Sequence, residues 1–435
     1  MDPLAIGGLG IAALFVLILA QIPIGFAMII VGVAGFALQT SWGPALTILA
    51  NEPSGVLSSV DLAAVPLFLL MGTFATAAGF SADIYNAAAA VLGHRRGGLA
   101  YATIGGCAIF GAVCGSSTAT AATFAKAALP EMLRRGYSPG FSTGTIAAGG
   151  TLKSLIPPSI VMILYCIIAK AFIFDLFVAA VLPAVLAIAL NLIAITIMVR
   201  LDPASAPVGD RVPWPERRAA LINAAPVLLL MLAVFAGLYS GVFTVNEAAS
   251  VAAVLSLVFA VARGRMSWAV AWQGMRESGS ATAMIYIMII GALVFTYFIT
   301  LARVPEALIQ AIGRLNMPPV AVISVMLVAY LILGAVFDEI SAMLITLPFV
   351  LPIIEKMGYD AVWWGIINVV VIELGMIIPP IGIIVFILHG LAPQIPIRAI
   401  YRGVVPFIIA DLLLLALLTL FPAISLWLPA ALKGP

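Results

Sequence analysis

Long apolar runs separated by short polar stretches extend along almost the whole chain. A helix that crosses a membrane needs about 20 mostly apolar residues, so each long run is a candidate crossing. The candidate runs are residues 4–20, 24–40, 65–80, 144–168, 176–199, 221–240, 247–262, 281–300, 362–388 and 404–426. The pattern therefore predicts an all-α integral membrane protein that crosses the bilayer many times.

Two further apolar stretches, residues 99–130 and 320–352, are too long for one crossing, and polar residues interrupt each of them near its middle. The interruptions read Gly-Ser-Ser-Thr from Gly115 and Asp-Glu-Ile-Ser from Asp338. Two half-crossing helices that meet at a polar tip fit these stretches better than one helix does. Such re-entrant hairpins are tolerated where protein or a water-filled cavity surrounds the tip.

Short identical strings recur along the chain in the same order, at a nearly constant spacing of 222 or 223 residues. The pairs are Gly111-Ala112-Val113 with Gly334-Ala335-Val336, Leu129-Pro130 with Leu351-Pro352, Gly136-Tyr137 with Gly358-Tyr359, Pro157-Pro158 with Pro379-Pro380, and Pro183 with Pro406. Chance is a poor explanation for so many ordered matches. They predict two related halves, residues 1–199 and 219–435, joined by a linker at residues 200–218 that contains four prolines and seven charges.

Basic residues orient these halves in the membrane. Those assigned to one side are Arg95, Arg96, Arg134, Arg135, the arginines of the linker, Arg263, Arg265, Arg276, Arg398 and Arg402. Residues 41–61, on the other side, contain no Lys or Arg. The positive-inside rule then makes the linker cytoplasmic and places both termini outside. The exceptions are Lys170, Arg303, Arg314, Lys356 and Lys433.

The number of crossings determines how the second half enters the membrane. With about five crossings and one hairpin in each half, the number is odd, so the second half enters inverted. Inverted-topology repeats with broken elements at matching positions are typical of a transporter whose binding site lies near the bilayer midplane.

Composition narrows the classes of function. Apolar residues make up 64% of the chain and charged residues 9%, whereas a soluble domain is about 25% charged. A net charge of +2 does not indicate a nucleic-acid partner, and the three cysteines form no CxxC pair. The HExxH, GxSxG and Walker patterns are absent, which argues against an enzyme and against ATP use by this chain. A passive channel is an alternative to a transporter. The first apolar run lacks a basic flank and is interpreted as a retained span.

The first tip offers two kinds of recognition. Gly115 permits unusual backbone angles, and the hydroxyls of Ser116, Ser117 and Thr118, with freed carbonyls, are hard oxygen ligands for a cation. A helix that begins at such a break also favours an anion at its N-terminus. The alternative is that these small residues only allow tight helix packing.

The second tip carries two adjacent carboxylates, Asp338 and Glu339. Each costs roughly 2.5–3.5 kcal/mol on insertion scales if it is central and unpaired. Such side chains usually face a cavity or a partner, and simple pairing with a neighbouring helix remains an alternative for either one.

Two of the candidate crossings are broken by proline pairs, Pro157-Pro158 and Pro379-Pro380. Paired prolines remove amide donors and leave carbonyls free at membrane depth. Lys153 precedes the first pair and Glu373 precedes the second. A buried lysine at this position either meets a substrate carboxylate or neutralises Glu373 or Asp338, and the sequence leaves both possibilities open.

These strings together resemble the large membrane subunit of TRAP transporters, the tripartite ATP-independent periplasmic uptake systems for carboxylates. The family pattern G-x-x-x-G-S-S-x-A-T-A-A, followed by a basic residue and P-E-M, matches residues 111–132. Its G-T-L-x-x-L-I-P-P-S string matches residues 150–159, and E-x-G-x-I-x-P-P-x-G matches residues 373–382. Lys153-Ser154 and Asp338-Glu339 depart from the family pattern, which usually has a small or apolar pair and a single acid at these positions.

The resemblance implies an elevator-type, sodium-coupled importer of a small organic anion in the bacterial inner membrane, with both hairpins and both broken helices in the mobile domain. It implies a small membrane subunit of four helices and a periplasmic substrate-binding protein as partners, and no organic cofactor. A stand-alone sodium–carboxylate or anion symporter of the related ion-transporter fold is the alternative. The expected substrate-binding residues are Ser117, Thr118, Lys153, Pro157, Pro158, Asp338, Glu373, Pro379 and Pro380. The expected sodium ligands, partly through backbone carbonyls, are Gly115, Ser116, Ser117, Thr151, Asp338, Ser341 and Gly375.

Small residues in the first two spans suggest where a membrane partner docks, since small residues let helices approach closely in lipid. These residues are Gly7, Gly8, Gly10, Ala12, Ala13, Gly25, Gly32 and Gly35. The alternative is that they pack only within the chain.

Overall fold

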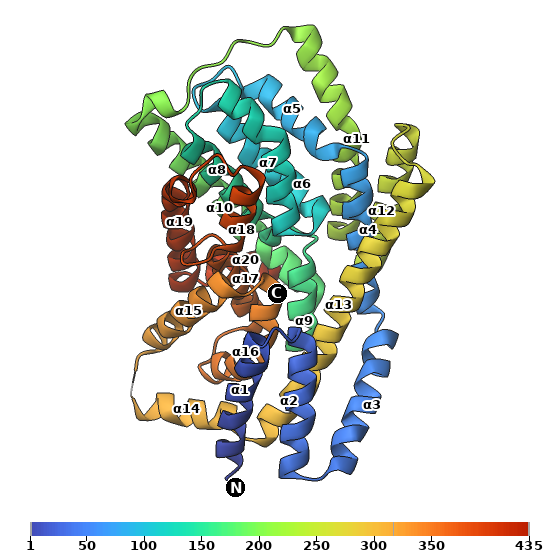
Figure 1. The fold of residues 1–435 in the computed structure, drawn as a ribbon, viewed down its shortest axis with the longest axis vertical. Coiled ribbons are helices and arrows are strands. Elements are labelled where there is room, and N and C mark those ends of the chain that lie inside the picture. Colours follow the sequence, from blue (N-terminus) through green and yellow to red (C-terminus); the bar gives the residue numbers. More distant parts are fainter. Residues whose placement is uncertain (1, 316, 434–435) are drawn as a thin grey trace.

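The computed structural model describes residues 2–315 and 317–433, and every regular element in that part of the chain is a helix (Figure 1). The first half contains α1 (Pro3–Leu19), α2 (Ile24–Gln39), α3 (Trp42–Ser58), η1 (Asp61–Ala63), α4 (Ala64–Ala77), α5 (Phe80–Leu92), α6 (Gly98–Cys114), α7 (Ser117–Arg134), α8 (Pro139–Thr151), η2 (Leu152–Leu155), α9 (Ile160–Ala169) and α10 (Ile173–Leu201). The rest contains η3 (Pro203–Ser205), α11 (Trp214–Tyr239), α12 (Val245–Ala262), α13 (Trp268–Leu301), α14 (Val304–Arg314), α15 (Pro319–Val336), α16 (Glu339–Lys356), α17 (Ala361–Gly375), α18 (Ile383–Leu391), α19 (Ile397–Leu420) and α20 (Ala423–Lys433).

Six helices in the described part of the chain are long and apolar enough to cross a membrane. They are α10, α11, α12, α13, α15 and α19. The number rises to eight if two bent pairs each count as one span, α3 with α4 at 64° and α8 with α9 at 42°. An all-α, multi-pass membrane protein is therefore confirmed, while the inverted arrangement of two repeats stays a prediction.

Both long apolar stretches consist of two helices that break at the polar residues. The backbone of Gly115 between α6 and α7 has a φ of 72°, in the left-handed region that glycine adopts without strain. Between α15 and α16, Asp338 is the N-cap of α16. The two proline pairs lie in breaks as well, Pro157-Pro158 between η2 and α9 and Pro379-Pro380 between α17 and α18.

The two halves of the chain interlock. Helix α2 packs along α13, α4 along α12, α8 along α19, and α7 against α18. Figure 1 shows α4, α11, α12 and α13 along one side of the molecule and α8, α10 and α19 along the other. The contact of α8 with α19 is so close that a Cβ added at Gly403 would lie 1.8 Å from the carbonyl oxygen of Gly140. Only glycine allows this approach.

The glycines of the first two spans pack mostly inside the chain. A Cβ added at any of five of them would lie less than 3.0 Å from another residue of this chain, and only at Gly8 would it meet open space. The five are Gly7, Gly10, Gly25, Gly32 and Gly35. The interpretation of these glycines as a docking surface is therefore wrong for all but Gly8, and the alternative of packing within the chain is correct.

Candidate functional site

At the first tip the hydroxyl of Ser117 points into the protein, whereas those of Ser116 and Thr118 lie at the start of α7. The side chain of Ser116 caps α7 by accepting a hydrogen bond from the amide of Ala119 at 3.3 Å, and it shares a 3.1 Å hydrogen bond with the hydroxyl of Thr118. Ser117, the first residue of α7, is fully buried. Its hydroxyl donates toward both carboxylate oxygens of Glu373, at 2.7 and 2.9 Å.

The first proline-broken helix delivers a lysine and a serine to the same point. Helix α8 tightens into the short turn η2, which contains Lys153 and Ser154, before the chain reaches Pro157. The Lys153 side chain is 1% exposed, and its ammonium donates to the carbonyl of Gly115 and to Oε1 of Glu339, each at 3.1 Å. Glu339 is the first residue of α16, at the second tip.

The two carboxylates meet around the serine hydroxyls. The hydroxyl of Ser154 contacts Oε2 of Glu339 at 3.1 Å and also Oε1 of Glu373. The hydroxyl of Ser117 lies 3.3 Å from the same oxygen of Glu339. We call these five side chains the central cluster: Ser117, Lys153, Ser154, Glu339 and Glu373. The central cluster thus joins both tips, the first broken helix and α17 at one buried point.

The central cluster contains three ionisable side chains. It contains two carboxylates, on Glu339 at 8% exposure and Glu373 at 4%, and one ammonium, on Lys153. An isolated buried charge costs several kcal/mol, and close pairing with additional hydrogen bonds offsets that cost. The ion pair of Lys153 with Glu339, together with hydrogen bonds from the hydroxyls of Ser117 and Ser154, explains how three ionisable side chains persist in an apolar interior.

Four of the residues expected at a binding site lie together here: Gly115, Ser117, Lys153 and Glu373. The sequence left two roles open for Lys153, binding of a substrate carboxylate and pairing with Glu373 or Asp338. In the structure Lys153 has an internal partner, but that partner is Glu339. The Asp338 side chain makes its hydrogen bonds outside the cluster. Its carboxylate accepts from the amides of Ile340 and Ser341 at 3.1 and 3.2 Å and from the Ser341 hydroxyl, so it caps its own helix.

The remaining expected residues are dispersed. Thr151 donates to the carbonyl of Ala148 in its own helix at 2.8 Å. Gly375 lies against Gly334, and a Cβ at Gly375 would be 2.6 Å from its Cα. The two proline pairs differ, because Pro157 and Pro158 are buried whereas Pro379 and Pro380 are exposed. The carbonyl of Pro380 accepts a hydrogen bond from Tyr401 at 3.0 Å.

Glu339 and Ser154 are cluster members that the sequence did not assign to the site. One signal for Glu339 is present in the sequence, because it lies 222 residues after Ser117, at the spacing of the internal repeat. The two residues occupy the first positions of α7 and α16, and their side chains are in contact. Ser154 belongs to one of the two departures from the family pattern, Lys153-Ser154, but that departure does not say what its side chain contacts.

A cavity of about 430 Å³ adjoins the first tip, between that tip and helices α4 and α13. Its lining mixes apolar and polar side chains, with Glu277 as the one charged residue and no lysine or arginine among the described residues that line it. The others include Thr73, Thr76, Ser116, Thr123, Gln273 and Ser278. The volume is enough for a small organic molecule, which would meet hydroxyls and amides at the start of α7.

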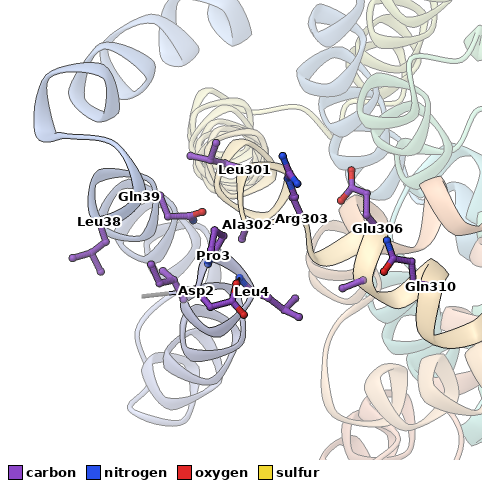
Figure 2. Close-up of a pocket in the computed structure, with 12 residues that line it drawn as sticks. Asp2, Pro3, Leu4, Leu38, Gln39, Leu301, Ala302, Arg303, Glu306 and Gln310 are labelled. Atoms are coloured by element: carbon purple, nitrogen blue, oxygen red, sulfur yellow. The ribbon is translucent and has the colours of Figure 1, made fainter.

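A larger cavity of about 750 Å³ lies away from these residues, among the start of α1 and the ends of α2 and α13 (Figure 2). Its charged side chains are Asp2, Arg303 and Glu306, and it contains none of the expected site residues. In the described part of the chain, no three His, Cys, Asp or Glu side chains form a group that could hold a metal ion.

Comparisons with known proteins agree on one family. Residues 11–424 match the family model described as the DctM component of the tripartite ATP-independent periplasmic transporter. The C4-dicarboxylate TRAP transporter large permease protein DctM of Pseudomonas aeruginosa is 35% identical over 396 residues, covering 88% of this chain and 92% of the relative. The ectoine/5-hydroxyectoine TRAP transporter large permease protein UehC of Ruegeria pomeroyi is 31% identical over 425 residues, covering 96% of this chain and 98% of the relative.

A solved structure is similar in fold. The crystal structure of the YdaH transporter of Alcanivorax borkumensis superimposes with a TM-score of 0.59 at 16% identity, covering 87% of this chain and 88% of that chain. At this identity the likeness concerns the fold alone.

Proposed function

The chain belongs to the DctM family of TRAP transporters and is a multi-pass transport permease, not an enzyme. We propose that it imports a small organic anion together with sodium across the bacterial inner membrane. The proposed partners are a small membrane subunit of four helices and a periplasmic protein that binds the substrate first. No organic cofactor is required. The expectation of these partners and of sodium rests on the family resemblance.

The observation that carries this proposal is the central cluster. Coupled transport requires that substrate and co-transported ion act on the same structural element, because each changes the other's affinity only through a shared conformational equilibrium. Ser117 at the first tip and Glu339 at the second are bonded through one network to Lys153 and Glu373. A movement of either tip would therefore alter hydrogen bonds made by the other tip.

The proposed substrate is a carboxylate, a dicarboxylate or a sugar acid. The relatives named above are permeases for C4-dicarboxylates and for ectoines. The cavity at the first tip has no basic side chain among its described lining, and the ammonium of Lys153 is already paired with Glu339. An anion in this cavity would instead be held by hydroxyls and by the N-terminus of α7.

An elevator movement is the proposed mechanism. The hairpins and α17 would move as one body, because the central cluster ties them together. The long contacts of α2 with α13 and of α4 with α12 would form the stationary part. Each inward sodium ion would gain about 2.3 kcal/mol per 100 mV of membrane potential, so two or more ions would support strong accumulation.

Uptake by the reconstituted system tests the proposal. The purified chain is placed in proteoliposomes with its membrane partner and binding protein, and a panel of labelled C4-dicarboxylates, ectoine and sugar acids is offered. Accumulation is expected under an inward sodium gradient and should disappear when potassium or choline replaces sodium. Lys153→Met, which removes the charge and fills the space, should abolish uptake, whereas Lys126→Ala, on the exposed surface of α7, should retain it.

Two outcomes would change the assignment. Uptake that is indifferent to the choice of cation would reject sodium coupling. Full sodium-driven uptake by the chain alone would assign it to the stand-alone anion symporters instead.

A further inference from the structure

The ammonium of Lys153 occupies the place where the first tip would hold a cation. The carbonyl of Gly115, one of the expected sodium ligands, accepts a hydrogen bond from Lys153 at 3.1 Å. The hydroxyl of Ser117 is directed to Glu373, and that of Thr151 to a carbonyl of its own helix. Ser116 caps α7. With Lys153 present, the expected ligands at the first tip do not fit a sodium ion, since each already has a partner within the chain.

The chain makes room for this lysine. A Cβ added at Gly111 would lie 2.4 Å from the Cβ of Lys153, so the stem of the lysine runs where a side chain at residue 111 would otherwise be. The stem then carries the ammonium to Gly115 at the end of the same helix, α6. The side chain is buried along its whole length, and its charge is delivered to the tip from a fixed point on η2.

The second half of the chain has no lysine at the corresponding place. The internal spacing of 222 or 223 residues relates Gly111 to Gly334 and Lys153 to Gly375. Gly334 and Gly375 are also in contact, as Gly111 and Lys153 are. At the second tip this pair therefore brings two backbones together without supplying a cation. The two tips are built alike in their helix pairs and differ in this charge.

The ligands of the ammonium are those that a hard cation prefers. Lys153 binds one carbonyl oxygen and one carboxylate oxygen, of Gly115 and Glu339, and alkaline-earth ions in proteins take the same oxygen types. Removing the lysine side chain would leave these two oxygens, with the hydroxyl of Ser154 and the carboxylate of Glu373, around the space that it filled.

We infer that the ammonium of Lys153 is a built-in cation that replaces a sodium ion at the first tip, so that this permease binds and carries one sodium ion fewer than a form without the lysine would. The inference rests on the proposed function only in taking sodium as the co-transported ion. It gives the first tip the positive charge of the Lys153 ammonium in place of that of an ion. The driving force gained from each transport cycle is correspondingly smaller.

Sodium binding to the full-length purified chain, without substrate, tests the inference. The ²²Na⁺ bound at saturation and the melting temperature in sodium chloride against choline chloride are measured for the wild-type chain and for Lys153→Ala. Lys153→Ala opens the space and should bind about one more sodium ion per chain, with a larger sodium-dependent rise in melting temperature because binding stabilises the folded state by mass action. Lys153→Met removes the charge but fills the space, and should gain no sodium. Lys126→Ala is the surface control and should behave as wild type.

Rescue by sodium covers a variant that does not fold by itself. If Lys153→Ala is recovered from membranes in sodium but not in choline, the inference is supported. If it is recovered in neither, Lys153→Asn is used, because its amide oxygen supplies an additional ligand. Failure of sodium to rescue both variants, or equal sodium binding by Lys153→Ala and wild type, would overturn the inference.

These outcomes are separable from those for the proposed function. A wild-type chain that binds no sodium, together with a Lys153→Ala variant that does, would reject sodium coupling and leave the inference standing. Sodium-driven uptake by the wild type, with no additional ion bound by Lys153→Ala, would support sodium coupling and reject the inference.

Discussion

Replacing Lys153 by methionine should destabilise the folded chain more than replacing Glu339 by glutamine. If Lys153 and Glu339 formed an isolated ion pair, the two substitutions would lower the free energy of unfolding by similar amounts. Here the cluster contains two carboxylates and one ammonium. Lys153→Met leaves both carboxylates buried without a cation, whereas Glu339→Gln leaves one ammonium and one carboxylate, with the amide still able to hydrogen-bond Ser154.

The magnitudes follow from burial. Removing one partner of a buried ion pair costs about 3–5 kcal/mol, which we expect for Lys153→Met because Lys153 and its partner Glu339 are only 1% and 8% exposed. Glu339→Gln should cost about 1–3 kcal/mol, as for a buried polar group that loses a hydrogen bond. Unfolding entropy of about 2.1 cal/mol/K per residue over 435 residues converts the first loss to a fall in melting temperature of roughly 3–5 °C.

Thermal melting of the purified chain in choline chloride provides the assay, with the double variant completing a cycle. Lys153→Met with Glu339→Gln leaves a single carboxylate, so it should be more stable than Lys153→Met alone, with a coupling energy of at least about 1–2 kcal/mol. Arg134→Met is the control, because Arg134 pairs with Glu131 at 2.6 Å but is 75% exposed. Surface pairs of this kind contribute about 0–1 kcal/mol.

Additive losses in the double variant would refute the reasoning, since they would mean that the two charges do not stabilise each other. A greater loss for Glu339→Gln than for Lys153→Met would refute the claim that the cluster depends more on its one ammonium than on the carboxyl group of Glu339.

Three further predictions concern the frame around the cluster. Gly403→Ala should sharply reduce the yield of folded protein in size-exclusion chromatography, because its Cβ would clash with the backbone of α8, whereas Gly279→Ala, with open space around it, should not. Arg263→Ala should lower the melting temperature by the equivalent of about 2–4 kcal/mol, because Arg263 pairs with Asp83 and lies 5.2 Å from the centre of the Phe80 ring; an unchanged melting temperature would contradict this. Reporter domains fused at Pro207 and at Gly434 should lie on opposite sides of the membrane, and the same side for both would reject the inverted repeat.

The positions of the two helix breaks could be predicted from the sequence because the signal for each break is local. Polar residues inside an apolar stretch mark a break wherever the tertiary fold places it, and both breaks lie at the polar strings. Helix α3 was not predicted as a helix, since Asn51, Glu52 and Pro53 interrupt its apolar pattern and residues 41–61 were treated only as a segment free of basic residues. In the structure Pro53 lies within α3, and the helix is bent against α4.

The choice between Asp338 and Glu339 shows where sequence patterns reach their limit. Both carboxylates occur at the same break, and the pattern of apolar residues does not distinguish them. Capping preferences contain part of the answer, because aspartate is favoured at an N-cap and accepts hydrogen bonds from its own helix, as Asp338 does. That Glu339 then reaches Lys153, 186 residues earlier in the chain, depends on how α16 packs and has no local signal.

The cluster is difficult to explain by stability alone. Buried ion pairs are weak contributors, because the cost of desolvation can exceed the attraction, and well-packed apolar residues often serve as well or better. A membrane interior increases this cost. The cluster nevertheless places three ionisable side chains where the two tips meet, with Gly111 allowing space for the lysine stem. A built-in cation at the first tip gives these charges a role in ion coupling, and that role predicts that sodium, and not methionine, can take the place of the lysine.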